Sequence, residues 1–236
     1  MYNQNEYSVA GSEQKLAAAF PVLMRKVYLW MTLALAITGV TAYIASQSPS
    51  IMVAIYSNRL LFWGLLIGEI ALVWYVSARI DRLSLTTATL LFALYSVLNG
   101  LTLSFIFLAY TDTVIAKAFF CAAGTFAVMS VVGYVIKRDL SGMGRILVML
   151  LIGLIIASVV NLFWSNGTLD IIITYAGVLI FVGLTAYDTQ KIKQMLAGAD
   201  DAYDSVMQKT ALLGALSLYL DFINLFLYLL RIFDRN

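Results

Sequence analysis

Long apolar segments alternate with short polar joints over most of this chain. A helix that crosses the hydrocarbon core of a bilayer needs about 20 predominantly apolar residues, and seven segments meet that length. The predicted spans are residues 27–46, 60–78, 83–109, 114–136, 146–164, 171–190 and 211–233. The joints carry charge or helix-breaking residues, and both prolines lie outside the spans. The pattern therefore predicts an all-α membrane protein with seven transmembrane helices.

Composition supports this fold class and narrows the function. Hydrophobic residues make up 62% of the chain and charged residues 12%, about half of the roughly 25% that is usual in soluble domains. A net charge of +2 does not indicate a nucleic-acid partner. The absence of histidine removes the commonest ligand of catalytic metal sites, so no enzyme activity is expected. The single cysteine, Cys121, lies in an apolar run and is interpreted as a small buried hydrophobe.

The chain is expected to form a polar N-terminal cytoplasmic tail, residues 1–22, and a seven-helix domain, residues 23–236. The tail lacks the features of a signal peptide and has room for a short surface helix. Eleven of the fifteen Lys and Arg residues fall on the side that holds the N-terminus, which places that side in the cytoplasm. Arg231 and Arg235 run against this rule at the C-terminus. A re-entrant last segment, with both ends inside, is therefore kept as an alternative.

The last predicted span carries small and polar residues at spacings of three and four, which places them on one face of a helix. These residues are Gly214, Ser217, Asp221, Asn224, Tyr228 and Arg231. Polar groups at membrane depth face a bundle interior or a water-filled cavity, so the stripe is interpreted as the lining of a polar path. The alternative is a hydrogen-bonded seam between helices. Asp221 favours the path, because a neutral asparagine would make a less costly seam.

Asp188, near the inner end of the sixth span, is the candidate partner of Asp221. An ion pair with Lys191, three residues further on, is the competing interpretation. Helical rise places Asp188 roughly 5 Å inside Lys191 and Asp221 roughly 18 Å inside Lys209, which permits the acid pair without establishing it. Two close carboxylates in a medium of low dielectric constant would share a proton and could switch near neutral pH. Deprotonated, they would offer oxygen ligands suited to calcium.

Three further charges are candidates for this site. Arg79 and Arg82, in the joint after the second span, lie at a depth comparable with Asp188 and could act as its counter-ion. Ordinary cytoplasmic anchoring explains them equally well. Glu69 is a buried charge in the middle of the second span and needs a partner, for which Arg231 is the nearest available cation.

The segments "GLTAYDTQKIK" (183–193) and "LSLYLDFINLFLYLLRIF" (216–233) resemble the two signature segments of the Bax inhibitor family, the transmembrane Bax inhibitor motif proteins. The similarity extends from about Met24 to the end and is strongest to the bacterial inner-membrane branch. The resemblance implies that helix seven lies at the centre of two three-helix layers. It also implies a pH-sensitive calcium leak in which Asp188 and Asp221 are the proton sensor. The same two residues are the predicted calcium ligands, from the carboxylate chemistry given above.

The resemblance further implies a latch, formed by an arginine at the end of helix two and the first aspartate in the closed state. Alignment on "NGLTL" (99–103) assigns this role to Arg82, whereas alignment on Glu69 falls near Arg79. Both residues are therefore kept as latch candidates.

The predicted function is a pH-sensitive calcium or cation leak channel gated by a di-aspartate proton sensor, with a role in calcium homeostasis. The expected partners are the lipid bilayer, calcium and protons, and no cofactor is expected apart from calcium as permeant or bound ion. The alternative is a non-transporting regulatory protein that binds a membrane protease or a stress-response partner through its tail. The predicted location is the bacterial inner (plasma) membrane.

Overall fold

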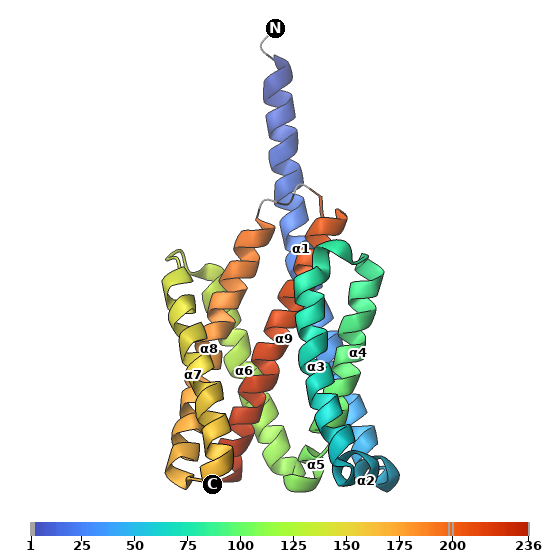
Figure 1. The fold of residues 1–236 in the computed structure, drawn as a ribbon. Helices are drawn as coiled ribbons and strands as arrows, with labels where there is room; N and C mark the ends of the chain where they lie inside the picture. Colours follow the sequence, from blue (N-terminus) through green and yellow to red (C-terminus); the bar gives the residue numbers. More distant parts are fainter. Residues whose placement is uncertain (1–2, 198, 200, 236) are drawn as a thin grey trace. The chain divides into compact units, whose positions relative to one another are not determined.

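The computed structural model describes residues 3–197, 199 and 201–235, with side chains from Ala19 onward. Within these ranges every regular element is a helix (Figure 1). The elements are α1 (Asn3–Ser46), α2 (Pro49–Ser57), α3 (Arg59–Arg79), η1 (Ile80–Arg82), α4 (Leu85–Leu103), α5 (Ile106–Ala109), α6 (Asp112–Val135), α7 (Ser141–Trp164), α8 (Gly167–Leu196) and α9 (Ser205–Asp234). Seven helices in the described part are long and apolar enough to span a membrane, which confirms the predicted fold class.

The helices extend further than the apolar windows. The predicted tail is helical from Asn3 and continues directly into the first span, which begins at Ala19. The helix α9 is a single helix of 30 residues, about 45 Å long at 1.5 Å per residue. A re-entrant segment requires a reversal of chain direction, and α9 has none, so that alternative is wrong.

The contacts divide the chain into two units. The first unit comprises Met1–Ala109 and Ile192–Leu216, and the second comprises Tyr110–Lys191 and Ser217–Asn236. The helices α8 and α9 each contribute to both units. The predicted position of the last helix between two layers concerns the arrangement of these units and stays a prediction.

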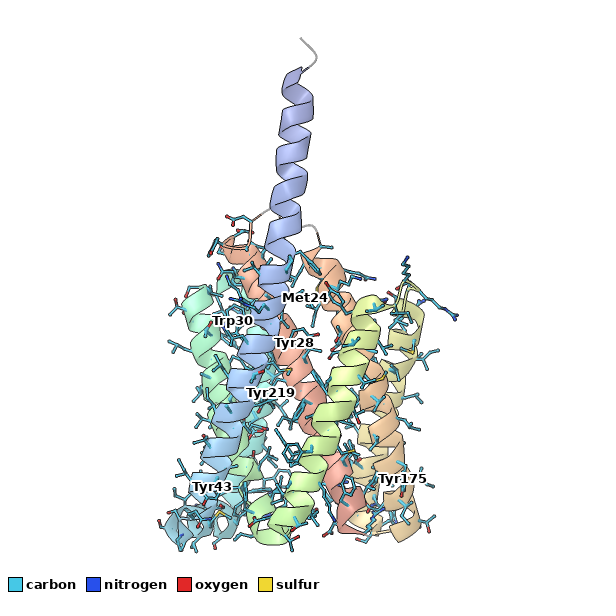
Figure 2. All side chains as sticks on the ribbon, turned by 180° about the vertical axis from the view of Figure 1, so that it is seen from behind. Met24, Tyr28, Trp30, Tyr43, Tyr175 and Tyr219 are labelled. Atoms are coloured by element: carbon cyan, nitrogen blue, oxygen red, sulfur yellow. The ribbon has the colours of Figure 1, made fainter. Side chains whose placement is uncertain are left out.

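In the first unit, α1 packs along α4. The Thr38 hydroxyl on α1 donates to the carbonyl of Ser96 on α4 at 3.0 Å, a bond that holds two helices together where no water competes. Tyr43, near the end of α1 remote from the N-terminus (Figure 2), places its ring 5.8 Å from that of Phe107. Aromatic and hydroxyl contacts thus supply the specificity that leucine-rich surfaces lack.

The third predicted span is interrupted, and a residue from the joint before the second span forms hydrogen bonds with the backbone groups freed at the interruption. The helix α4 ends at Leu103 and α5 begins at Ile106. The joint before the second span forms α2, and its Tyr56 hydroxyl donates to the Thr102 carbonyl at 3.0 Å. The Tyr56 hydroxyl oxygen also accepts a hydrogen bond from the Phe105 N–H at 3.3 Å. Backbone groups freed inside a membrane need such partners, which explains why the break is tolerated.

Lysines hold the segment between α8 and α9 within the first unit. The Lys26 ammonium donates to the Ala202 carbonyl at 3.1 Å and lies 5.0 Å from the centre of the Tyr203 ring. The Lys209 ammonium donates to the carbonyl of Asp81 at 3.0 Å. Lys209 therefore belongs to the body of α9 and does not mark where that helix begins.

In the second unit, α6 approaches α8 closely. A Cβ atom added to Gly133 would lie 2.2 Å from the carbonyl oxygen of Ala186, so only glycine allows the two backbones to come this near. The ring of Phe126 on α6 lies 5.6 Å from that of Phe222 on α9. The side chain of Tyr219, labelled in Figure 2, is fully buried. One face of α6 thus packs against the parts of α8 and α9 that carry the aspartates.

Candidate functional site

The second unit brings together Asp188 on α8 with Ser217 and Asp221 on α9. The Ser217 hydroxyl donates a hydrogen bond to the Asp188 carboxylate. Asp188 and Asp221 lie close enough for their carboxyl groups to interact electrostatically. Lys191 also acts on Asp188 through its charge, but its ammonium is placed over the Tyr187 ring, 6.0 Å from the centroid. The two carboxyl groups therefore interact, and no ion pair of Asp188 with Lys191 forms among the described residues.

The depth estimate from sequence misplaced both aspartates because it took lysines as helix ends. The helix α8 runs past Lys191 to Leu196, and α9 begins at Ser205. Counted from these ends at 1.5 Å per residue, Asp188 lies about 12 Å along α8 and Asp221 about 24 Å along α9. The difference of about 12 Å is more than two helical turns, so counting along the helices does not bring the two acids level, and their interaction requires an offset or a tilt between α8 and α9.

Asp221 has an unsatisfied oxygen. The residue is only 5% exposed, and its Oδ2 atom has no hydrogen-bond partner among the described residues. Two hydroxyls in the same unit share this condition, those of Ser130 on α6 and Thr189 on α8. A buried polar group without a partner costs about 1–3 kcal/mol. Such atoms call for a proton, a water molecule or a cation.

Ser130 is a residue that the sequence analysis missed. It lies between Phe126, which contacts Phe222, and Gly133, which contacts Ala186, on the face of α6 turned toward α8 and α9. Its helical spacing from other buried positions of α6 was the available signal. A single serine in an apolar span is also common at helix seams, so the spacing alone could not identify it.

The C-terminal half of the predicted stripe is only partly enclosed. Asn224 and Tyr228 are half-buried, and Arg231 is exposed. The Asn224 amide donates to the carbonyl of Leu220 on its own helix at 2.8 Å. The Tyr228 ring stacks on Phe181 with centroids 5.9 Å apart, and the Arg231 guanidinium lies 5.7 Å from the Tyr228 centroid. These contacts close the stripe with aromatic rings in this conformation.

A charge cluster at the start of α8 includes a second missed residue, Asp170. Its carboxylate pairs with Arg235 and lies 4.0 Å from the Arg231 guanidinium. Tyr110 lies near this cluster, and burial raises the pKa of its hydroxyl above the usual value of 10.0. The position of Asp170 in the first turn of α8 favours a negative charge, but sequence alone does not pair it with α9.

Glu69 has neutral partners in the first unit. The carboxylate is 8% exposed and accepts hydrogen bonds from the Thr102 hydroxyl at 2.7 Å and the Asn99 amide at 3.1 Å. The expected pairing of Glu69 with Arg231 is therefore wrong, because α4 supplies neutral donors to Glu69 while Arg231 faces Asp170. Hydrogen-bond donors can satisfy a buried carboxyl group without a counter-ion.

Arg79 and Arg82 are exposed residues of the first unit, at the end of α3 and of η1. Asp188 belongs to the second unit. The latch stays a prediction, as does the choice between these two arginines.

The acid pair has the donor chemistry of a calcium site but is an incomplete one. Calcium takes six to eight oxygen ligands from carboxylates, carbonyls and water. No group of three or more Asp, Glu, Cys or His side chains with metal-binding geometry occurs in the described part of the chain. Two carboxylates with adjacent hydroxyls therefore suit a weakly held, partly hydrated ion better than a tightly bound one.

The chain is similar to known membrane proteins over nearly its whole length. A family model described as "Inhibitor of apoptosis-promoting Bax1" matches residues 21–236. The "Inner membrane protein YbhL" of Escherichia coli (strain K12) is 50% identical over 219 residues, covering 93% of this chain and 94% of that protein. An uncharacterised protein of Borreliella burgdorferi is 45% identical over 213 residues, covering 90% and 91% of the two chains. With seven membrane-spanning helices and these matches, the chain is an integral membrane protein that belongs to the Bax inhibitor family.

Proposed function

We propose that this protein is a proton-regulated calcium leak of the bacterial inner membrane, with Asp188 and Asp221 as the titrating pair. The observation that carries the proposal is a pair of carboxyl groups on adjacent helices, one of which has a buried oxygen without a hydrogen-bond partner. The membrane assignment follows the name of the Escherichia coli relative, an inner membrane protein.

The pair can change state with pH because its members interact. Two carboxylates held close in a low-dielectric environment repel each other, so the pair takes up a proton in preference to carrying two charges. The protonated pair is a poor ligand for a cation. The deprotonated pair offers several hard oxygens, to which Ser217 can add its hydroxyl oxygen. Protons and calcium thus compete for the same atoms, and calcium binding weakens as the pH falls.

Calcium flux in liposomes tests this proposal directly. Purified wild-type protein and Asp221→Asn are reconstituted with a calcium indicator inside, and uptake is followed from mildly alkaline to mildly acidic pH. The asparagine keeps the size of the side chain but cannot exchange a proton, so we expect the flux to lose its pH response and to fall at least about tenfold.

The matched control is Glu69→Gln, which makes the same carboxylate-to-amide change at the other buried acid. It should leave the flux and its pH response intact. Wild-type flux and pH response in Asp221→Asn would overturn the proposal.

A further inference from the structure

A polar pocket in the second unit is separate from the acid pair. It has a volume of about 410 Å³, which lies within the range of about 300–1,000 Å³ that is usual for small-molecule sites. The end of α7, the α7–α8 turn, the first turn of α8 and the end of α9 form its walls. Its lining includes Ser158, Asn161, Leu162, Asn166, Asp170 and Arg231.

The hydrogen-bond acceptors of this pocket are already used by the protein. Asn161 Oδ1 accepts the N–H of Asn166 at 2.9 Å, and Asn166 Oδ1 accepts the N–H groups of Thr168 and Leu169 at 2.9 and 3.1 Å. One carboxylate oxygen of Asp170 pairs with Arg235, and the other faces Arg231. These partners fix both asparagine side chains with their oxygen atoms turned toward the backbone.

The hydrogen-bond donors of the pocket, in contrast, can still bind a ligand. Within the described part of the chain, the amide nitrogens of Asn161 and Asn166 donate to no protein acceptor, although their oxygens are engaged. Arg231 is 49% exposed and lies at 4.0 Å from Asp170, whose closer partner is Arg235. Asp234 is the other acid near these arginines, and it is exposed and does not line the pocket. A wall with free N–H donors, a guanidinium and engaged acceptors suits an oxyanion.

The backbone of the turn supports a specialised role. Ser165 has φ 42°, in the left-handed region that residues other than glycine rarely adopt. The bonds from Asn161 and Asn166 hold this turn in place. Strain of this kind concentrates at binding sites, where it persists because the surroundings over-determine it.

The surface next to the pocket identifies the source of the oxyanion. Leu162 lines the pocket and is 70% exposed, and it is followed on α7 by Phe163 and Trp164, 78% and 76% exposed. This helix has the highest mean hydropathy of the seven spans in the described part, 2.9. Tryptophan at a helix end marks the membrane–water interface. The pocket therefore opens on a surface that faces lipid, at headgroup depth.

We propose that this pocket binds the phosphate of a phospholipid headgroup, through the Arg231 guanidinium and the Asn161 and Asn166 amides. Leu162 and Phe163 then lie beside the acyl chains. The site is independent of the proposed calcium leak, since neither aspartate of the acid pair takes part in it.

Binding of a short-chain phosphatidylglycerol to the purified full-length protein tests the site, in a neutral detergent without calcium. We expect saturable thermal stabilisation of the wild type, and an affinity lowered at least about tenfold in Arg231→Gln and in Asn161→Asp. Asn161→Asp retains the oxygen that accepts the Asn166 N–H, so the turn persists, but it replaces the donor by a negative charge. Arg59→Gln, a loss of one positive charge in the first unit, should bind like the wild type.

Three results would overturn the proposal in different ways. Equal lipid affinity in the wild type, Arg231→Gln and Asn161→Asp would exclude the pocket as the site. Stabilisation by inorganic phosphate at the concentration at which the lipid saturates would exclude the lipid as the specific ligand. A short-chain diacylglycerol, which has no phosphate, should have no effect on the wild type, and stabilisation by it would exclude headgroup recognition.

Discussion

Each of the two units buries a carboxylate site at membrane depth, and the two sites are satisfied differently. In the first unit, both oxygens of Glu69 accept hydrogen bonds from side chains of α4. In the second unit, Asp221 is equally buried but keeps an oxygen without a partner, and a second acid lies nearby. The same chemical group thus joins two helices through hydrogen bonds in one unit and keeps an oxygen available for a ligand or a proton in the other. The hydrogen-bond partners of each carboxyl group, more than its burial, separate the two roles.

The strongest test of this difference is the pair of single variants Asp188→Asn and Asp221→Asn together with the double variant. If the two acids act as one proton-binding unit, each single change should abolish most pH-dependent calcium flux, and the double variant should be no worse. The measurement is the rate of calcium entry into proteoliposomes. Losses that multiply in the double variant would show that the acids act independently.

Substitution of Glu69 should change the stability of the protein and leave the calcium flux unchanged. Glu69→Leu removes an acceptor from the Asn99 amide and the Thr102 hydroxyl, and since the hydroxyl keeps the Asn99 carbonyl at 3.0 Å, the expected cost is about 1–3 kcal/mol, mainly from the amide. Glu69→Gln retains one acceptor and supplies a donor, so its cost should stay below about 1 kcal/mol. Thermal unfolding in detergent compares the two variants. A Glu69→Gln protein as unstable as Glu69→Leu would mean that the charge itself is needed.

A smaller effect is expected from Gly133, which sets the distance between α6 and α8 beside the acid pair. Gly133→Ala places a methyl group against the Ala186 carbonyl and should cost about 1–3 kcal/mol through forced separation of the helices. Gly124→Ala, on the same helix, meets no atom within 4 Å and should be neutral or slightly stabilising. Unfolding temperatures that do not differ between these variants would argue against the close approach.

The smallest effect concerns Asp139, a solvent-exposed acid that provides the reference for the two buried sites. Hydrogen bonds from the Ser141 hydroxyl and N–H lower its pKa below the ordinary 3.8. A lowered pKa in the folded state contributes stability above the unfolded pKa, and this contribution is lost as the pH falls through the folded pKa. Asp139→Ala should therefore lower the unfolding temperature slightly at neutral pH, and the difference should vanish in strong acid. A difference that grows with acidity would contradict this assignment.

Apolar length predicted the seven spans because each helix must satisfy its own backbone in lipid. The same rule could not reveal α2 or the break between α4 and α5, since the break depends on the Tyr56 hydroxyl, a contact between residues far apart in sequence. The ends of α8 and α9 were also misjudged, because Lys191 and Lys209 sit on helices that continue past them. The length of an apolar segment matches the thickness of the hydrocarbon core. It does not show how far the helix continues outside the bilayer.

For the site, helical spacing identified the residues of α9 that include Ser217 and Asp221, and position near the end of the sixth span identified Asp188, which the family resemblance then paired with Asp221. Partners that lie on other helices were missed. Glu69 was assigned a cation because charge balance ignores neutral donors such as Asn99 and Thr102. Asp170 and Ser130 were overlooked because their importance depends on which residues α6 and α8 face. Spacing along one helix fixes a face, whereas only tertiary structure says what that face meets.

The tyrosine that completes the interrupted third span also constrains how the polypeptide enters the bilayer. Tyr56 precedes that span in the chain, so its hydroxyl is synthesised before the backbone groups that it will satisfy. Lateral release of the third span into lipid on its own would leave the peptide groups around Ser104 facing hydrocarbon. Insertion of the second and third spans as one hairpin, with Tyr56 already docked, avoids this state.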